Sequence, residues 1–363
     1  MLFRSVSQSR YSVLGALVRA DITPVVYNCK VPFEVHKKLT DPTWMSDQQH
    51  TQSKTCAQIA KELDVDPWTV ARRFHEAGIE IKIHPFSEGE KAVGDFIESL
   101  GVQLNRNSRK IIPPKELDIY IPSHNLAIEF CGVYWHGENQ GKYRTYHKEK
   151  HTACREKGIQ LLTIYDWEWN NRQLQVEQKI RSLLGKNNSE VTYARKCSIN
   201  RLSTSQKHEF FEKYHIQGSG PGSINYGLMF DDELVAAISI IKTNNEYIIN
   251  RYASKNRVVG GFSKLLRHFQ QNHDWRRIIS FADLRWSDGH MYETLGFKLE
   301  CEIPPDYAYI INSRPMHKFA FRHSALKNKL SNYDPTKSEW ENMKNHGYDR
   351  IWDCGKLRYV IEK

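Results

Sequence analysis

The segment LDIYIPSHNLAIEFCGVYWH, residues 117–136, predicts the β-hairpin around which the central part of the chain folds. Residues 117–122 alternate between apolar and polar side chains with the period of two that is typical of a strand. Residues 123–125 are typical of a turn, and residues 126–131 form the returning strand.

A carboxylate stands in the middle of each of these two apolar strands. Asp118 shares a face with Tyr120 on the first strand, and Glu129 shares a face with Cys131 on the second. Burying a carboxylate is costly unless it meets a cation or hydrogen-bond donors. A hard divalent ion is held in proteins by one or two carboxylates, so the pair predicts a metal site.

The second strand continues through Gly132, which permits an abrupt bend, to His136. A neutral imidazole beside a metal-bound phosphate can take a proton from water or stabilise a charged transition state. Each residue taken alone also has a purely structural interpretation, and these stay open. In that interpretation Asp118 is a turn residue at a strand end, and His136 is a histidine packed near Trp135.

Residues 87–101 predict an amphipathic helix before the hairpin, with Ser87 as its N-cap and Glu90 three residues on. Its expected buried stripe consists of Val93, Phe96, Ile97 and Leu100. Glu90 is either the carboxylate of a capping box or a catalytic carboxylate, and the sequence leaves both open.

Residues 55–78 predict two short helices joined by a turn, with Asp66 capping the second helix and Gly78 ending it. This spacing is typical of a helix-turn-helix. Its second helix would present four side chains to phosphates and base edges in the DNA major groove. They are Trp68, Thr69, Arg72 and Arg73. The alternative is a plain helical hairpin packed on a neighbouring domain.

The central segment resembles the very-short-patch-repair (Vsr) endonuclease fold, and more closely the EDxHD group of phage homing endonucleases, both in the PD-(D/E)xK-like nuclease class. The residues that carry the resemblance cover about 85 positions. They are Ser87-x-x-Glu90, Glu116-Leu-Asp118-Ile-Tyr-Ile-Pro122, Ala127-Ile-Glu129-Phe-x-Gly132-x-Tyr-Trp-His136, Tyr146-His147, Cys154, Gly158-Ile and Ile164-Tyr-x-x-Glu168-Trp169.

The resemblance implies DNA-strand hydrolysis with Mg²⁺ held by Asp118 and Glu129, help from Glu90, and proton transfer or phosphate stabilisation by His136. The lysine of a strict (D/E)xK motif would fall at Cys131. The last acidic residue of the group's pattern is either Asp166 or Glu168.

The segment around residues 146–157 predicts a helix that carries two further features. His147, His151 and Cys154 share one face at metal-ligand spacing, which indicates either a zinc site or ordinary burial. The basic residues of the same helix indicate a phosphate-facing edge or a solvated face. They are Lys148, Lys150, Arg155 and Lys157.

Residues 190–363 predict a hairpin turning at 231–233, a strand at 247–252, a helix at 262–271 and a strand at 277–282. Together with GHMYETLGF at 289–297, this order resembles the GNAT acyltransferase fold. In that fold an (R/Q)xxGx(G/A) loop binds the coenzyme A pyrophosphate through backbone N–H groups.

The equivalent loop here is Arg257-Val-Val-Gly-Gly-Phe262, and we expect Phe262 to crowd a phosphate. A GNAT-like scaffold reused for DNA contact or assembly is therefore favoured over acyl transfer.

The composition is that of a soluble intracellular protein. The net charge of +10 favours a polyanionic partner. Its apolar runs are too short to cross a bilayer, and no signal peptide is evident. The seven cysteines, without a CxxC pair, indicate a reducing compartment.

The sequence thus predicts a multidomain α/β protein. Residues 1–85 carry the helix-turn-helix, residues 86–185 the Vsr-like restriction-endonuclease fold, and residues 190–363 the GNAT-like domain. The expected function is Mg²⁺-dependent, site-specific cleavage of double-stranded DNA in the cytoplasm of a phage-infected bacterium, without membrane binding. The sequence does not decide whether the protein forms a homodimer. Two alternative functions also stay open: an acyltransferase with a degenerate nuclease domain, and a non-catalytic DNA-binding regulator.

Overall fold

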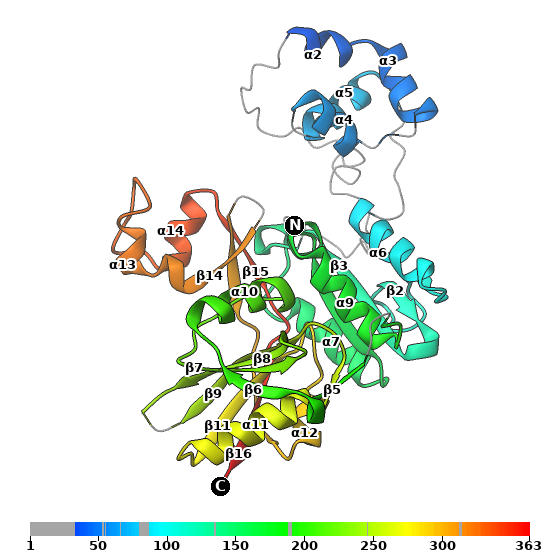
Figure 1. The fold of residues 1–363 in the computed structure, drawn as a ribbon. Coiled ribbons are helices and arrows are strands. Elements are labelled where there is room, and N and C mark those ends of the chain that lie inside the picture. The colour runs from blue at the N-terminus through cyan, green and yellow to red at the C-terminus, as the bar shows by residue number, and fades with distance from the viewer. Residues whose placement is uncertain are drawn as a thin grey trace. The chain divides into compact units, whose positions relative to one another are not determined.

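The computed structural model describes residues 33–52, 54, 56–65, 67–79, 87–133, 136–187, 191–244, 246–311 and 314–363. They belong to two compact units, residues 1–91 and 92–363 (Figure 1). Asp66, the expected helix cap, lies outside the described residues, and so do the side chains of Trp68 and Arg72. Within the described residues, no helix is both long and apolar enough to cross a membrane.

The first unit is helical. Its elements are α2 (Phe33–Lys38), α3 (Pro42–Ser46), a π-helical turn (Asp47–Thr51), α4 (Cys56–Leu63) and α5 (Pro67–Glu76). The apolar residues predicted on α4 and α5 meet in one core, in which Ile59, Val70 and Phe74 are fully buried. Gly78 follows α5 with φ of +68°, a conformation that glycine adopts without strain. The two predicted helices are thus confirmed, whereas the DNA-reading motif stays a prediction.

Residues 92–185 surround a four-stranded sheet of order β1-β2-β3-β4. The two neighbouring strands of the predicted hairpin pair antiparallel, and β4 lies parallel to β3. The elements are α6 (Glu88–Ser99, which spans the boundary between the units), β1 (Asn105–Ser108), β2 (Leu117–Ile121), β3 (Leu126–Cys131), α7 (Tyr146–Arg155), β4 (Gln160–Tyr165), α8 (Asp166–Asn171) and α9 (Gln173–Leu183).

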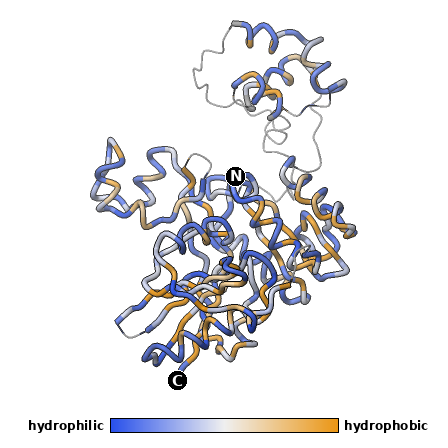
Figure 2. Tube along the Cα trace, viewed as in Figure 1, coloured by the Kyte–Doolittle hydropathy of each residue, from blue (hydrophilic) through white to orange (hydrophobic). Residues whose placement is uncertain are grey.

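Helices cover both faces of this sheet. Ile119 and Ile128 pack with Ile97 of α6 and Ile180 of α9 on one face. On the other face Cys154 of α7 packs with residues of β2, β3 and β4. Helix residues alternate between hydrophilic and hydrophobic, as burial of one side requires (Figure 2). The predicted hairpin and the helices after residues 87 and 146 are confirmed, whereas the polar strand β1 carries no alternating pattern and was missed.

A seven-stranded sheet of order β12-β16-β11-β9-β8-β7-β6 forms the centre of residues 191–363. Its strands and helices are β6 (Ser198–Arg201), α10 (Thr204–Tyr214), β7 (Ile224–Phe230), β8 (Glu233–Lys242), β9 (Tyr247–Ser254), α11 (Gly261–Asn272), β11 (Arg277–Asp283), α12 (His290–Thr294), β12 (Lys298–Ile303) and β16 (Lys356–Glu362). Strands β9 and β11 pair in parallel. Every element predicted for this region is present.

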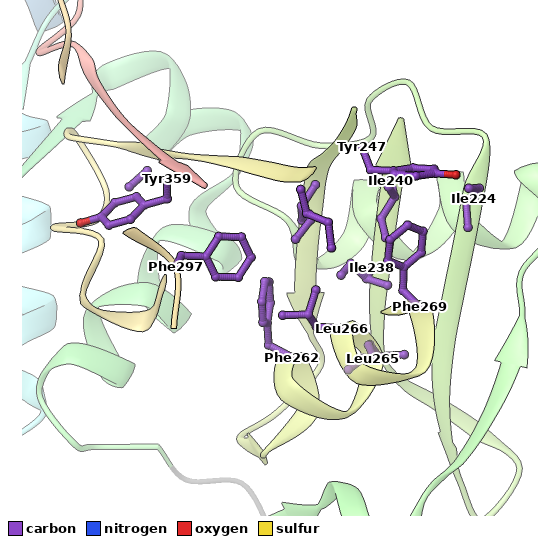
Figure 3. Packing of buried hydrophobic residues seen from close by; sticks show 14 of the residues in the cluster. Ile224, Ile238, Ile240, Tyr247, Phe262, Leu265, Leu266, Phe269, Phe297 and Tyr359 are labelled. Atoms are coloured by element: carbon purple, nitrogen blue, oxygen red, sulfur yellow. The ribbon is translucent and has the colours of Figure 1, made fainter. Parts of the chain in front are cut away.

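Helix α11 supplies much of the core of this sheet (Figure 3). Its residues Phe262, Leu265, Leu266 and Phe269 are buried with Ile238 of β8. The insertion between β12 and β16 adds a small sheet of order β14-β13-β15 and two helices. They are β13 (Tyr307–Ile311), β14 (Arg314–His317), α13 (His323–Leu326), α14 (Glu339–Asn345) and β15 (Asp349–Trp352). Short strands β5 (Thr192–Tyr193) and β10 (Val258–Val259) pair separately.

A buried ion pair joins the two sheets of the second unit. Arg285, just after β11, donates two hydrogen bonds of 3.1 and 3.0 Å to the carboxylate of Glu168 on α8. The Arg285 carbonyl accepts from the Thr163 N–H of β4, and Trp286 belongs to the core of the four-stranded sheet. Residues 92–363 are therefore held together by polar and apolar contacts at this junction.

Replacement of Arg285 by Met is expected to lower the free energy of unfolding by about 3 kcal/mol, because it leaves the Glu168 carboxylate buried without its cation. Urea unfolding followed by tryptophan fluorescence measures the loss. The exposed Arg276→Met provides the control, and adding Glu168→Gln to Arg285→Met should restore part of the stability. A loss equal to that of the control would contradict a stabilising junction.

Candidate functional site

The sheet register brings the two predicted carboxylates together. In the β2–β3 hairpin Ile119 pairs with Ile128 and Tyr120 with Ala127, so the next pair along is Asp118 opposite Glu129. Directly opposed residues share a face of the sheet and lie close enough to bind one ion. Both side chains are buried, at 1% and 2% exposure. Asp118 Oδ2 accepts a hydrogen bond of 2.7 Å from the Phe130 N–H, which fixes its orientation.

A lysine from helix α7, which covers this face of the sheet, contacts one of the two carboxylates. Lys150 of α7 is buried, and its ammonium donates to Glu129 Oε2. The interpretation of Lys150 as part of a solvated helix face is therefore wrong, because its side chain lies buried on the inner face of α7. Of the other basic residues, Lys148 forms an ion pair of 2.6 Å with Glu302.

The position of Lys150 had a signal in the sequence. It lies three residues after His147 and four before Cys154, which is the spacing of one helical face. All three are buried. A lysine between two such residues points to the interior, where it needs a carboxylate.

His136 stands where the bend after β3 places it. Its N–H donates to the Gly132 carbonyl over 3.0 Å, which closes a tight turn. Its ring stacks on His147, with centroids 5.2 Å apart and an interplanar angle of 21°. Burial, reinforced by the neighbouring His147, holds the pKa of His136 well below its ordinary value, so the ring is neutral at neutral pH.

His147 connects this turn to the end of β3. Its Nδ1 lies 4.0 Å from Cys131 Sγ. Burial lowers the pKa of His147 to about 3. The cysteine and the two histidines form a group whose ligand atoms all lie within 4.8 Å of one another.

The two acidic residues after β4 have different surroundings. Glu168 is the partner of Arg285 and accepts the Tyr165 N–H at 2.9 Å. Asp166 Oδ1 accepts the N–H of Val133, in the segment between β3 and His136, at 3.2 Å. Burial raises the pKa of Asp166.

The remaining predicted residues belong to the first unit. Glu90 is buried, and its N–H donates to Ser87 Oγ over 3.1 Å, so Ser87 caps α6 as expected. Arg73 forms a 3.0 Å ion pair with Glu76 within α5, and Thr69 is half-buried. The roles predicted for Glu90, Thr69, Arg73, Trp68 and Arg72 stay predictions.

A cleft of about 1740 Å³ lies between α9 and the seven-stranded sheet. It is lined by Arg181 of α9, Arg251 of β9, and residues 260–263 at the start of α11. The Phe262 ring points into the core, where it packs on Tyr252 and Tyr292 with centroids 5.0 and 6.0 Å away (Figure 3). The expectation that Phe262 crowds a phosphate at this loop is therefore wrong.

No family model matches the sequence, and no curated protein matches it significantly. Solved structures that resemble about half of the chain are acetyltransferases. A Bacillus subtilis acetyltransferase in complex with CoA is 14% identical, with 46% of this chain and 99% of that chain covered and a TM-score of 0.28. For a GNAT family acetyltransferase from Elizabethkingia anophelis with acetyl-CoA bound, the identity is 12%, the coverage 46% and 99%, and the TM-score 0.26.

The ribosomal-protein-S18-alanine N-acetyltransferase from Escherichia coli is 11% identical, with coverage of 46% and 93% and a TM-score of 0.27. At such identities and scores the likeness assigns no activity to this chain.

Proposed function

We propose that the chain is a Mg²⁺-dependent, site-specific DNA endonuclease of the homing type. One observation carries this proposal: Asp118 and Glu129 oppose each other on neighbouring strands, and the buried Lys150 lies on Glu129. The two carboxylates offer oxygen ligands for the metal ion of an assisted phosphodiester hydrolysis, and Lys150 of the covering helix adds a positive charge beside them.

The donor set fits Mg²⁺, which prefers oxygen ligands and is bound by one or two carboxylates, waters and substrate phosphates. Asp118 and Glu129 would hold the ion, which when bound polarises the phosphate and lowers the pKa of water. The strict (D/E)xK motif has a lysine at the position that Cys131 occupies here. Lys150 would replace that lysine and place its charge beside the phosphate. His136, as a neutral imidazole, would accept the proton of the attacking water.

Asp166 is the better candidate for the last acidic position of the motif. Its carboxylate contacts the backbone of the segment that leads to His136, whereas both oxygens of Glu168 are bound by Arg285. Asp166 would thus position His136 without touching the substrate.

Cleavage itself tests the function most directly. The full chain is incubated with host and phage DNA and Mg²⁺, and the resulting ends are sequenced. Breaks at a defined site that disappear with chelator support the proposal. DNA binding without any Mg²⁺-dependent break would instead favour a non-catalytic regulator.

The DNA partner gives a second test. Arg72→Ala combined with Arg73→Ala is expected to weaken DNA binding and to reduce the slope of log affinity against log salt by up to about 2, because each phosphate contact contributes about 0.9. Fluorescence anisotropy at several salt concentrations measures the slope. Exposed Lys327→Ala is the control for loss of charge, and an unchanged slope would assign both arginines to a solvated surface.

Acyl transfer is the second candidate, and the cleft beside α11 favours it. Residues 260–263 line that cleft, and Gly260, the N-cap of α11, adopts φ of +74° and contributes no side-chain hydrogen bond to the first turn. A helix N-terminus whose N-cap residue leaves backbone N–H groups open suits a pyrophosphate. Calorimetric titration with acetyl-CoA tests this candidate: tight binding together with absent DNA cleavage would replace the nuclease proposal.

A further inference from the structure

Cys131, His136 and His147 converge from three separate segments. Cys131 ends β3, His136 closes the turn after it, and His147 lies in the first turn of α7. One ligand atom from each lies within 4.8 Å of the other two. Around a tetrahedral Zn²⁺ with Zn–N near 2.0 Å and Zn–S near 2.3 Å, ligand atoms would be about 3.3–3.6 Å apart. Shortening the distances between these ligand atoms by about 1 Å would therefore let all three bind one ion.

One nitrogen of each imidazole in this group has no hydrogen-bond partner within the described part of the chain, whereas His147 Nδ1 faces Cys131 Sγ. Among the residues that the structure describes, His136 Nδ1 and His147 Nε2 are buried and have no hydrogen-bond partner. Buried polar atoms are nearly always satisfied, so two such atoms in stacked rings need an explanation. Stacking on a second imidazole satisfies neither nitrogen, whereas a metal ion can bind a nitrogen of each ring.

We infer that Cys131, His136 and His147 bind one transition-metal ion of the Zn²⁺ class, separate from the Mg²⁺ proposed at Asp118 and Glu129. A thiolate and two imidazoles are ligands that Zn²⁺ accepts and Mg²⁺ disfavours. The ion links the end of β3, the turn and α7, and its fourth position is open to water or to another ligand.

This site differs from the one that the sequence indicated. The helix spacing combined His147 with His151 and Cys154, all on α7. In the fold, Cys154 instead packs in an apolar cluster with Leu117, Ala127 and Leu161, where it serves as a small hydrophobic residue. The inference does not rest on the proposed nuclease activity, because metal binding is measured without DNA. It competes with one role in that proposal, because a His136 imidazole that holds a metal ion is not the proton acceptor.

The test uses Co²⁺ as the probe. The full chain is stripped of metal with a chelator and titrated with Co²⁺, and absorption is recorded. One equivalent is expected to produce a thiolate-to-cobalt charge-transfer band together with the visible bands of a tetrahedral ion. Zn²⁺ should then displace Co²⁺ and remove the bands.

Variants locate the ion. Cys131→Ser should abolish the charge-transfer band and weaken Zn²⁺ binding by more than about 100-fold, since changes in groups that merely support ligands already cost 10–100-fold. His147→Gln should weaken binding while retaining thiolate character. Exposed Cys301→Ser is the matched control and should keep the band.

Asp118→Asn separates this inference from the proposed nuclease. It should keep full Co²⁺ binding and the band while losing cleavage. If wild-type protein gives no charge-transfer band, or if Cys131→Ser retains it in a folded protein, the inference is overturned. Circular dichroism confirms folding for each variant.

Discussion

Asp118→Asn is expected to abolish Mg²⁺-dependent DNA cleavage, lowering the single-turnover rate by more than about 10³-fold. Removal of one hydrogen-bond donor to a transition state costs about 10²–10³-fold, and loss of a metal-binding charge removes more. Asn keeps the size of Asp, and its amide oxygen can still accept from the Phe130 N–H. The neutral side chain also removes the repulsion between carboxylates opposed across the hairpin. The variant should therefore fold at least as stably as the wild type.

Nicking of supercoiled DNA that carries the target measures this rate, alongside DNA affinity at fixed salt. Affinity should stay nearly unchanged, because phosphate and groove contacts determine it. Asp231→Asn at the β7–β8 turn is a matched control, since Asp231 has φ of +48° and Asn tolerates this conformation. Cleavage by Asp118→Asn at the wild-type rate would exclude the proposed metal site.

His136→Ala is expected to lower the cleavage rate by about 10²–10⁴-fold, the usual contribution of general acid–base catalysis. The ring is neutral at neutral pH because burial keeps its pKa well below the ordinary histidine value. A neutral ring can accept a proton until the pH falls below that lowered pKa. The acid limb of the wild-type pH–rate profile should therefore lie below about pH 6.5 and disappear in the variant.

A melting curve accompanies these kinetics, because a purely structural His136 would lose stability and activity together. His290→Ala is the control, since the His290 side chain is 80% exposed. Full activity in a stably folded His136→Ala protein would transfer proton handling to Lys150 or to a second metal-bound water. If a metal ion is bound by Cys131, His136 and His147, the cleavage rate of His136→Ala should still fall. The Co²⁺ spectrum then distinguishes the two roles, because loss of a ligand changes the spectrum and loss of a proton acceptor does not.

Local patterns in the sequence were sufficient for the β2–β3 hairpin and for the opposed carboxylates. Period-two alternation assigns each side chain to a face, and a three-residue turn sets the pairing that follows. For the same reason the helices at residues 56–63, 67–76 and 261–272 could be predicted from apolar spacing and end signals. These features depend on neighbours within a few residues.

Contacts between distant elements were decided only by the tertiary structure. Lys150 lies on Glu129, 21 residues away, because α7 packs its inner face over β3. Arg285 reaches Glu168 across 117 residues, and this pairing separates Glu168 from Asp166 as candidates. Periodicity tells which side of an element is buried but not which element covers it. The partner of a buried charge is therefore decided by the packing of whole helices on sheets.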